Sequence, residues 1–493
     1  MKNRLKILMA FSEVAPFSKT GGLGDVGGTL PKALKDMGHD VRVITPQYRR
    51  INERKYVLRD VIRLQDIEVD MGGKKVSINV KSAFLPNSKV QVYFMDYRPY
   101  FFREGLYVNP KKNEDYPDNA HRYLLFCQGI LETLKKLQWQ PDVIHCNDWQ
   151  TGMIPFLLKH YYRNDPFFEK IHTLMTVHNF SFQGNFDKEC LSAMDLSPDF
   201  VFEDSGLDWN GECSFLKSGL IFADAVNTVS QRYAQEVQSS ETYGFGMDKV
   251  LKKRLDRLQG ILNGMDAQVW NPETDPIITE RYSIDDFSGK SACKQALVDE
   301  FGLKNGETPV VAMISRLTEQ KGVHLIQEIF EEMLGLPVFF VLLGLGDQRF
   351  HDYFKKMMKK YPNQVSAHFK FDDSLAHQII AGADLFLMPS LFEPCGLTQM
   401  YALKYGTVPV VFETGGLADT IQQFTGGSSG GNGYLFQKPT PKALLKVIKQ
   451  SISHYRDPKT WSRLMKNGMK VDLSWEKSAK KYIDLYQRCI EKS

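Results

Sequence analysis

The chain has 493 residues, of which 43% are hydrophobic and 24% charged, and its formal net charge is +4. Domains usually run ~100–250 residues, so this length predicts two large domains rather than one core. The composition is that of a globular protein. The small net charge argues against a general nucleic-acid binder, which would carry a concentrated basic face. A local cluster of positive charge for a small phosphorylated ligand is still compatible with it.

Cysteine usage and hydropathy predict the compartment. The seven cysteines are scattered and form no Cys-x-x-Cys pair, which argues against a zinc site or a redox pair and fits a reducing cytoplasm. The apolar run Ile7–Phe11 is too short for a signal-peptide core, and no run approaches the ~20 residues of a membrane span. We therefore expect a cytoplasmic protein without membrane contact, in which Ile7–Phe11 is a buried first strand.

Short apolar runs alternate with helical patterns along the chain. In the first half the pattern predicts a helix at Leu30–Met37 and strands at Leu5–Phe11, Val41–Thr45, Val143–Cys146 and Thr173–Val177. In the second half it predicts strands at Val310–Ile314, Val338–Leu343, Leu385–Met388 and Val408–Phe412. This alternation predicts an α/β fold with parallel sheets covered by helices, whose ligands bind at the carboxyl ends of the strands.

The domain boundary is predicted where Gly and Pro interrupt the periodicity, from Asn263-Gly-Met-Asp-Ala to Trp270-Asn-Pro. This divides the chain into an N-terminal domain at 1–262, a C-terminal domain at 263–472 and a C-terminal helix at 473–493. One face of that helix is apolar and should pack on the protein body; it carries Trp475, Ala479, Tyr482, Tyr486 and Ile490.

The first motif, Gly22-Leu-Gly-Asp-Val-Gly27, matches the dinucleotide fingerprint but not its context. Ten residues separate Phe11 from Gly22, and the second strand ends in Ile44-Thr-Pro-Gln without an acid for a ribose, which argues against a nicotinamide cofactor. What remains is a glycine loop from Lys19 into a helix, with one cation, which suits an anion. An ordinary turn with a solvated lysine stays the alternative.

Three further motifs follow strands of the second half. Arg316 and Lys321 stand five residues apart after Val310–Ile314, where two cations can neutralise a departing diphosphate, although isolated basic residues are more often surface charges. Glu393 follows the next-to-last strand in a short loop; it could bind sugar hydroxyls or be a helix N-terminal acid. Thr414-Gly-Gly-Leu-Ala-Asp419 is a further candidate phosphate cradle.

The first half offers polar residues at strand ends in His145-Cys-Asn-Asp-Trp149 and Val177-His-Asn-Phe180. His, Asn and Asp there suit hydrogen bonds to sugar hydroxyls. One such histidine would more often be structural, but two clusters favour a binding role. The aromatic segment from Tyr100 to Tyr107 could stack on sugar rings, although packing is the commoner use.

Together these motifs resemble, in order and spacing, those of the bacterial and plant glycogen/starch synthase family. The resemblance rests on Lys19-Thr-Gly-Gly-Leu, His178-Asn, the Arg316/Lys321 spacing, Glu393-Pro-Cys-Gly-Leu-Thr-Gln and Thr414-Gly-Gly-Leu-Ala-Asp, and it runs from Lys6 to about Tyr486. It implies a retaining GT-B glycosyltransferase with two Rossmann-like domains facing across a cleft. It also implies ADP-glucose as donor, with ADP released, and the non-reducing end of an α-1,4-glucan, such as glycogen or a maltooligosaccharide, as acceptor.

The resemblance also implies roles for individual residues. Glu393 would face the sugar, Arg316 and Lys321 would hold the diphosphate, and His178 would complete the catalytic group. The remaining contacts to donor, glucose or acceptor would come from Lys19, Gly22, Asp25, Tyr107, Asp148, Asn179, Asn263, Cys395, Gly396, Leu397, Thr398, Thr414, Gly415 and Gly416. Two departures are visible: Tyr401 stands where many retaining GT-B enzymes carry a second glutamate, and Gly24 where many relatives have a larger residue.

The chemistry that fits one convincing acid among cations is attack on the face from which the diphosphate leaves, its oxygen taking the acceptor's proton. A retaining glycosidase would instead need two carboxylates ~5 Å apart. We expect no metal and no cofactor. The alternatives are another retaining GT-B enzyme with a UDP-sugar donor, a phosphorylase with a lysine-bound pyridoxal cofactor, or an inactive glucan-binding scaffold; the last should have lost Lys19, Arg316, Lys321 or Glu393.

Overall fold

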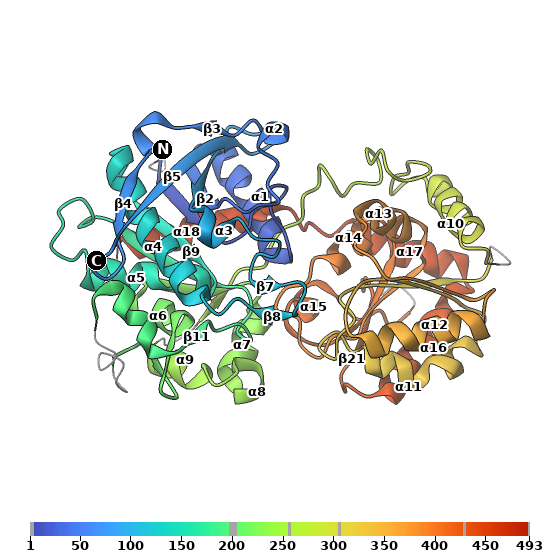
Figure 1. Cartoon of the computed structure of the whole chain (residues 1–493). Coiled ribbons are helices and arrows are strands. Elements are labelled where there is room, and N and C mark those ends of the chain that lie inside the picture. Colours follow the sequence, from blue (N-terminus) through green and yellow to red (C-terminus); the bar gives the residue numbers. More distant parts are fainter. Residues whose placement is uncertain (1–3, 197–204, 255–257, 304–306, 427–429, 492–493) are drawn as a thin grey trace. The chain divides into compact units, whose positions relative to one another are not determined.

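The structure is a computed structural model, and it describes residues 4–196, 205–254, 258–303, 307–426 and 430–491. Its contacts divide the chain into two compact units (Figure 1). Unit 1 consists of Met1–Val229, Ala234–Ile261 and Trp475–Ser493, and unit 2 of Ser230–Tyr233 and Leu262–Ser474. The chain thus leaves unit 1 after Ile261 and returns to it at Trp475, close to the boundaries expected after residues 262 and 472.

A large mixed sheet forms the centre of unit 1, in the order β15-β14-β10-β9-β1-β2-β6-β5-β3, with β4 paired to β5. The strands from β15 to β6 are parallel, as the alternating pattern predicts: β1 Lys6–Ala10, β2 Asp40–Pro46, β6 Gln91–Asp96, β9 Val143–Asn147, β10 His172–Val177, β14 Ala225–Thr228 and β15 Gln259–Gly260. An antiparallel edge that the sequence analysis missed completes it: β3 Arg59–Asp60, β4 Ile67–Asp70 and β5 Lys75–Phe84.

The rest of unit 1 covers this sheet and extends its loops. Its helices are α1 Gly22–Asp36, α2 Glu53–Tyr56, α3 Arg98–Phe101, α4 Asn119–Leu137, α5 Met153–His160, α6 Phe215–Phe222, α7 Gln231–Ser239 from Ala234 onward, α8 Glu241–Gly244, α9 Asp248–Arg254 and α18 Trp475–Glu491. Short 3₁₀ turns are η1 Ile62–Leu64, η2 Trp149–Thr151 and η3 Lys188–Met194. Two small antiparallel sheets pair β7 Val108–Asn109 with β8 Glu114–Asp115, and β11 Asn185–Phe186 and β12 Asp208–Trp209 with β13 Glu212–Ser214.

Helix α1 corrects one prediction. It was expected at Leu30–Met37, after a glycine loop, but it begins at Gly22, so the glycine-rich segment is its first turns. The glycines allow close packing there rather than a turn, because a Cβ on Gly28 would lie 2.5 Å from the carbonyl O of Ala15. A glycine pattern alone does not separate these two uses.

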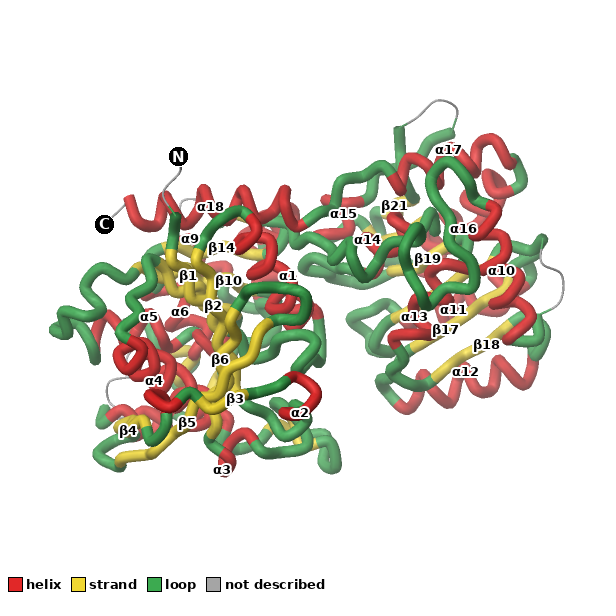
Figure 2. The backbone as a smooth tube through the Cα atoms, turned by 90° about the horizontal axis from the view of Figure 1, so that it is seen from above, coloured by secondary structure: helices red, strands yellow, loops and turns green. Residues whose placement is uncertain are grey.

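Helix α18, near the C-terminus, completes unit 1. It packs against α1 and β10 (Figure 2), and its face with Trp475, Ala479, Tyr482 and Tyr486 is buried. The Tyr486 hydroxyl lies 2.8 Å from Nδ1 of the fully buried His145, whose Nε2 lies 2.6 Å from Thr176 Oγ1. His145 therefore lies inside β9 and ties α18 to the sheet; its expected part in a sugar-binding cluster is wrong.

Unit 2 has a six-stranded, all-parallel sheet in the order β18-β17-β16-β19-β20-β21. Its strands are β16 Val310–Ile314, β17 Phe339–Leu343, β18 Val365–His368, β19 Leu385–Met388, β20 Val408–Phe412 and β21 Tyr434–Phe436. Its helices are α10 Ser288–Glu300, α11 Val323–Leu334, α12 Gln348–Lys360, α13 Asp373–Gly382, α14 Thr398–Lys404, α15 Gly415–Thr420, α16 Pro441–Tyr455 and α17 Pro458–Met469. In Figure 1, α11, α12 and α16 lie on one side of the strands and α13, α14 and α17 on the other.

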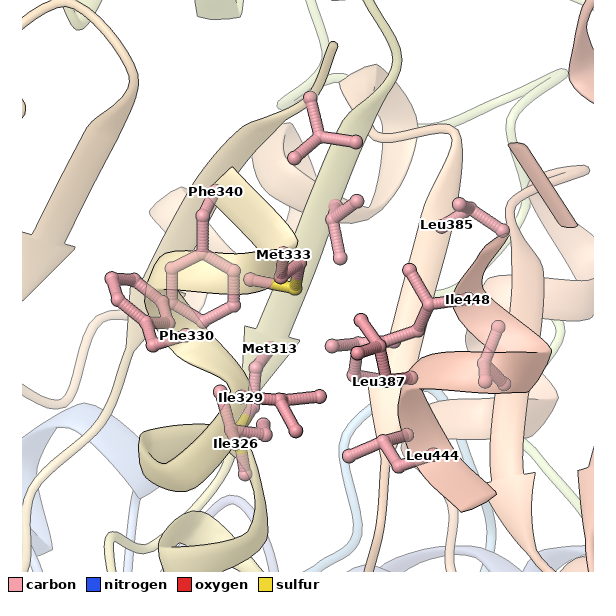
Figure 3. Packing of buried hydrophobic residues seen from close by; sticks show 14 of the residues in the cluster. Met313, Ile326, Ile329, Phe330, Met333, Phe340, Leu385, Leu387, Leu444 and Ile448 are labelled. Carbon is pink, nitrogen blue, oxygen red and sulfur yellow. The ribbon is translucent and has the colours of Figure 1, made fainter. Parts of the chain in front are cut away.

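The core of unit 2 forms where amphipathic helices meet the apolar strands. On α11, Ile326, Ile329, Phe330 and Met333 recur at helical spacing and point toward the sheet, as Figure 3 shows. Helix α16 contributes Leu444 and Ile448 to the same cluster. It begins at Pro441 because Thr440 caps it: Thr440 Oγ1 accepts the amide of Ala443 at 3.3 Å. This core fixes the strand ends from which the candidate site residues project.

Candidate functional site

Three neighbouring parallel strands of unit 1, β1, β9 and β10, end at the same edge of the sheet. The segments that follow them carry the candidate residues of this unit: residues 12–25 after β1, Asp148 after β9, and His178 and Asn179 after β10. Tyr107 joins them from another loop, because its hydroxyl lies 2.7 Å from Ser12 Oγ. The sequence-predicted residues of unit 1 are thus gathered at the carboxyl edge, where parallel α/β sheets bind ligands.

Lys19 and Asp25 form an ion pair beside the start of α1. Lys19 Nζ lies 2.8 Å from Asp25 Oδ1, and the side chains are 34% and 25% exposed. Gly22 is the first residue of the helix, and a Cβ on Gly24 would lie 3.2 Å from Lys19 Cβ, so glycine at that position leaves room for the lysine. Lys19 is therefore a partly exposed cation with a partner carboxylate.

Asp148 has an unusual backbone. Its φ of 57° and ψ of 179° lie in a region that non-glycine residues rarely adopt. The conformation directs its carboxylate to the turn after β10, where Oδ1 accepts the amide of His178 at 2.6 Å and a further bond comes from the amide of Asn179. Burial raises the pKa of Asp148 to about 7, although both amide bonds oppose the shift. Strain kept at a strand end in this way is typical of a functional position.

His178 is a neutral histidine with an assignable tautomer. Its Nε2 lies 2.9 Å from Asn147 Oδ1, and Asn147 Nδ2 donates to the carbonyl oxygens of Ala10 and His145, so the amide oxygen must accept. Nε2 of His178 therefore carries the proton and Nδ1 is an acceptor. Burial lowers the pKa of His178 to about 3, which keeps the ring uncharged near neutral pH.

Asn179 and Tyr107 complete this group of hydrogen-bonding side chains. Asn179 Oδ1 accepts the amide and the hydroxyl of Ser181, at 3.0 and 2.8 Å, so its oxygen shapes the turn and its Nδ2 is the group suited to a ligand. Burial, reinforced by the nearby Glu13 carboxyl, raises the pKa of Tyr107 well above its usual range, so its phenol stays protonated.

Unit 2 places Lys321 against Glu393. Lys321 Nζ lies 2.6 Å from Glu393 Oε2, the side chains are 16% and 9% exposed, and Ser390 Oγ donates to the same carboxylate oxygen at 2.9 Å. The two loops meet closely because Gly322 has a φ of 68° and packs where a Cβ would lie 2.0 Å from the carbonyl O of Pro389. The predicted cation and the predicted acid are thus one buried pair at the carboxyl edge of the sheet.

Arg316 lies on the same loop but is exposed. Within the part of the chain that the structure describes, its side chain makes no hydrogen bond or ion pair. The loop that carries it is fixed at both ends, since the amide of Leu317 donates to the carbonyl of Leu345 and the amide of Leu391 donates to Gln320. Arg316 is therefore an exposed cation on a loop that backbone hydrogen bonds hold in place.

The glycines after β20 let a third loop approach Glu393. Gly415 has a φ of 44°, and a Cβ there would lie 2.0 Å from the carbonyl O of Glu393, to which the amide of Gly416 donates at 3.0 Å. Thr414 precedes them as the residue before α15. Beside them the motif residues Gly396, Leu397 and Thr398 lead into α14, with Gly396 at a φ of 71°. The predicted residues after β19 and β20 therefore form one contiguous group.

Asn263 and Cys395 connect this group to the segment at which the chain enters unit 2. The Cys395 thiol interacts with the backbone of Asn263, and burial raises the pKa of that thiol to about 12. Asn263 is 5% exposed, and its Oδ1 has no hydrogen-bond partner within the residues described. A buried amide oxygen without a partner costs free energy, which a ligand donor would recover.

Tyr401 occupies the position at which many retaining GT-B enzymes carry a second glutamate. Trp270 is stacked between Tyr401, at 4.0 Å between ring centroids, and His377, at 3.7 Å. His377 Nδ1 in turn lies 2.6 Å from Asp275 Oδ2. The stack fastens the entry segment of unit 2 to α13 and α14, so this departure from the wider pattern has a packing role.

Glu13 and Ser390 are site residues that the sequence did not single out, whereas Asn147 belongs to the polar cluster predicted at the end of β9. Asn147 orients His178, Ser390 orients Glu393, and Glu13 accepts two hydrogen bonds from Thr20 beside Lys19. Each lies within a few residues of a recognised motif, which was the available signal. Over the described ranges, no group of three or more His, Cys, Asp and Glu side chains could hold a metal ion. No helix described here is long and apolar enough to cross a membrane.

Comparisons with known proteins agree with this organisation. The family model "Starch synthase catalytic domain" matches residues 6–253, and "Glycosyl transferases group 1" matches residues 296–471. Glycogen synthases of Desulforudis audaxviator and Thermotoga maritima are 42% and 41% identical to the chain, covering 99% of it and 97% and 99% of their own lengths. The catalytic domain of starch synthase IV from Arabidopsis thaliana, solved bound to ADP and acarbose, is 32% identical with a TM-score of 0.91, over 99% of this chain and 100% of that one. A sucrose-phosphate synthase from Thermosynechococcus elongatus, 16% identical with a TM-score of 0.60, shares the fold.

Proposed function

The chain belongs to the starch and glycogen synthase family of GT-B glycosyltransferases, and from this premise we propose that it transfers glucose from ADP-glucose to the non-reducing end of an α-1,4-glucan. The anomeric configuration is retained and ADP is released. The observation that carries the site assignment is the buried Lys321–Glu393 pair, which puts a fixed cation and a fixed carboxylate at one strand end.

The cations of unit 2 take the leaving group in this proposal. As the bond between the anomeric carbon and the diphosphate oxygen breaks, negative charge grows on that oxygen, and preorganised cations stabilise such charge without reorganisation. Lys321 has three N–H donors, of which Glu393 occupies one, so its ammonium can donate to the diphosphate without leaving its partner. Arg316 supplies a second, planar donor from the rigid loop. Because these two cations carry the charge, we propose that no metal is needed.

Glu393 and the glycine-flanked loops take the sugar and the nucleotide. The Glu393 carboxylate accepts from Lys321 and Ser390 through Oε2, which leaves Oε1 for sugar hydroxyls and for the positive charge that develops at the anomeric carbon. We propose that Asn263, whose amide oxygen has no partner within the residues described, contacts the donor. The same role is proposed for Cys395, Gly396, Leu397, Thr398, Thr414, Gly415 and Gly416.

Unit 1 supplies hydrogen bonds rather than charge. Neutral His178 offers an acceptor at Nδ1, Asn179 donors at Nδ2, Tyr107 a hydroxyl, and Asp148 a carboxyl; these groups suit the hydroxyls of glucose and of the acceptor. The acceptor's 4-hydroxyl oxygen forms the new bond to the anomeric carbon, and its proton passes to the departing diphosphate oxygen. Lys19, with Gly22 and Asp25 beside it, is proposed to contact the donor.

The test is a side-by-side assay of the purified chain with ADP-glucose and UDP-glucose, using glycogen and maltooligosaccharides as acceptors. We expect a much higher kcat/KM for ADP-glucose, and α-configured products by NMR. Activity unchanged by EDTA would agree with the metal-free proposal, and loss of activity restored by a divalent ion would contradict it. Equal or reversed donor preference would contradict the donor assignment, and no transfer from either donor would contradict the function.

A further inference from the structure

Glu13 is a buried carboxyl at the carboxyl edge of unit 1 that the proposed mechanism leaves without a task. It lies three residues beyond the end of β1 and is 3% exposed. Burying a carboxylate without partners costs free energy, so buried carboxylates are normally hydrogen-bonded or paired. The hydrogen-bond partners of Glu13 therefore indicate what its carboxylate does.

The partner of Glu13 is the donor-side loop itself. Glu13 Oε2 accepts both the backbone amide and, at 2.9 Å, the Oγ1 hydroxyl of Thr20, the residue that follows Lys19. A carboxylate oxygen that receives two donors from one residue fixes both the backbone and the side chain of that residue. Because Thr20 adjoins Lys19, the position of the lysine backbone follows from this contact.

Other contacts also hold the loop. The amide of Ala15 donates to the carbonyl O of Gly24 at 2.9 Å, and the buried ring of Phe17 packs against Phe94. Arg50 donates to the carbonyl O of Lys19 at 3.3 Å, and the Tyr56 hydroxyl donates to the carbonyl O of Pro16 at 2.9 Å, both on the exposed face. Among these contacts, the Glu13–Thr20 bonds are the ones that fix the residue next to Lys19 from the buried side. Lys19 Nζ itself reaches Asp25.

The groups that face Glu13 are acids and phenols. Asp25 faces it from α1, Asp148 from the end of β9, Tyr107 from its loop and Tyr123 from α4. Burial raises the pKa of Glu13 to about 7; the Thr20 bonds oppose this shift and the two aspartates reinforce it. The loop supplies one cation, the Lys19 ammonium, which is paired with Asp25.

From this geometry we propose that Glu13 is a positioning residue for the donor: its ionised carboxylate holds Thr20, and through Thr20 it sets the place of Lys19. The proposal rests on the proposed function only in naming the anion that Lys19 receives. It assigns no direct contact between Glu13 and substrate.

A proton on Glu13 weakens this hold. The ionised carboxylate accepts both Thr20 donors, whereas the protonated acid is a poorer acceptor and brings a hydrogen of its own. For one group with a pKa near 7, the ionised fraction falls from ~0.9 at pH 8 to ~0.1 at pH 6, and an apparent affinity that needs the ionised form falls in the same ratio. We therefore expect the KM for ADP-glucose to rise as the pH falls through 7, by up to about tenfold. The donor cannot cause this change, because its diphosphate is esterified at both ends.

The decisive variant is Glu13→Gln, which keeps the shape and an acceptor oxygen but cannot titrate. We expect its KM for ADP-glucose to be raised about three- to tenfold at pH 8, to vary less with pH than that of the wild type, and its kcat to change less than about threefold. Any pH dependence of the KM that remains in Glu13→Gln is attributed to the titration of Asp148. Glu68→Gln, which alters an exposed carboxylate paired with Lys75, is the matched control and should behave as the wild type.

Two further measurements keep the proposal testable. Thr20→Val removes the Oγ1 donor and should raise the KM for ADP-glucose as well, so this variant decides the question if circular dichroism shows that Glu13→Gln does not fold.

Hydrogen exchange of residues 14–24, which needs no activity, should be faster in Glu13→Gln than in the wild type at the same pH. A KM and pH profile equal to the wild type in a folded Glu13→Gln, or in Thr20→Val if that variant decides, would overturn the proposal. Unchanged exchange would also overturn it. Failure of the wild type to use ADP-glucose would overturn the proposed function alone, because the exchange experiment still judges Glu13.

Discussion

Each unit carries a lysine paired with a carboxylate at the carboxyl edge of its sheet, and the two pairs differ in burial. Lys19 and Asp25 in unit 1 lie 2.8 Å apart with side chains 34% and 25% exposed. Lys321 and Glu393 in unit 2 lie 2.6 Å apart with side chains 16% and 9% exposed, and Ser390 holds the carboxylate. Burial removes screening by water and salt, so the second pair is the stronger and the better oriented.

The surroundings of the two pairs differ in the same sense. Elsewhere at the carboxyl edge of unit 1, burial lowers the pKa of His178 to about 3 and raises the pKa of Asp148 to about 7, so these groups are neutral or titrate near neutral pH. In unit 2 the neighbours of Lys321 are the Glu393 carboxylate, a serine hydroxyl and backbone groups. This difference supports the proposal that unit 1 binds sugar by hydrogen bonds and that unit 2 stabilises the charge of the leaving group.

The largest expected effect is that of Lys321→Ala. If Lys321 stabilises charge that develops in the transition state, its loss should lower kcat by ~10²–10³, about 3–4 kcal/mol, and raise the donor KM less. Steady-state kinetics with circular dichroism measure this. A folded variant within a few-fold of the wild-type kcat would disprove the role, and a raised KM with normal kcat would reduce it to ground-state binding.

The control for this prediction is a lysine–glutamate pair with similar geometry but little burial. Lys360 Nζ lies 2.7 Å from Glu331 Oε1, with side chains 49% and 55% exposed, in the same unit. Exposed pairs of this kind contribute ~0.2–1 kcal/mol, so Lys360→Ala should leave kcat and KM unchanged. A large effect of Lys360→Ala would mean that burial does not distinguish these pairs.

The next effect concerns Asp148 and the pH dependence of stability. Its pKa is raised in the folded state, from 3.8 to about 7, so between these values the native chain holds more protons than the unfolded chain. This contribution to the free energy of unfolding is present at low pH and is lost as the pH rises through 7. Asp148→Asn does not titrate, so its stability relative to the wild type should increase from pH 5 to pH 8, by a few kcal/mol at most.

Urea titrations of both proteins at several pH values measure this difference. The buried histidines His145 and His178, whose pKa values are lowered to about 3, act in the opposite sense in both proteins and cancel in the comparison. A stability difference that is independent of pH would mean that burial does not raise the pKa of Asp148 in the folded chain.

The parallel core and the position of each motif could be predicted from the sequence because they are local. An apolar run followed by a polar loop and a helix places the motif residues at strand ends. The order of each sheet then brings Asp148 and His178 together in unit 1, and Lys321 and Glu393 together in unit 2. The antiparallel edge from β3 to β5 escaped prediction, since its strands are partly exposed and carry no motif.

Contacts between distant segments were beyond the sequence pattern. His145 reads like His178 in the sequence, yet its ring is held by Tyr486, which lies 341 residues further along the chain. Glu13 likewise has no signature, because its role depends on how the loop folds back to bring Thr20 to it. Pattern reasoning located the edges correctly but could not separate a ligand-binding histidine from one that holds a helix.

A smaller effect than that of Lys321 is expected for Lys19→Ala. Its ammonium is a third exposed and is partly neutralised by Asp25, so its contribution to donor binding is reduced by solvent and salt. We expect the donor KM to rise about tenfold with kcat changed less than about threefold, the signature of uniform binding. A kcat loss as large as that of Lys321→Ala would abolish the distinction between the two units.

The smallest effect is expected for Asp25→Asn, which removes the partner of Lys19 but leaves the lysine in place. The pair is partly exposed and therefore worth ~0.2–1 kcal/mol, so stability and kcat should barely change. The donor KM should fall by less than about threefold at low salt, since a carboxylate that competes with an anionic donor is gone, and the difference should shrink at high salt as screening increases. Asp25 also raises the pKa of Glu13, so the pH dependence of the KM should move to lower pH in this variant. Kinetics at two salt concentrations and several pH values measure both shifts, and an effect that persists at high salt would mean that the Lys19–Asp25 pair is as shielded from solvent as Lys321–Glu393.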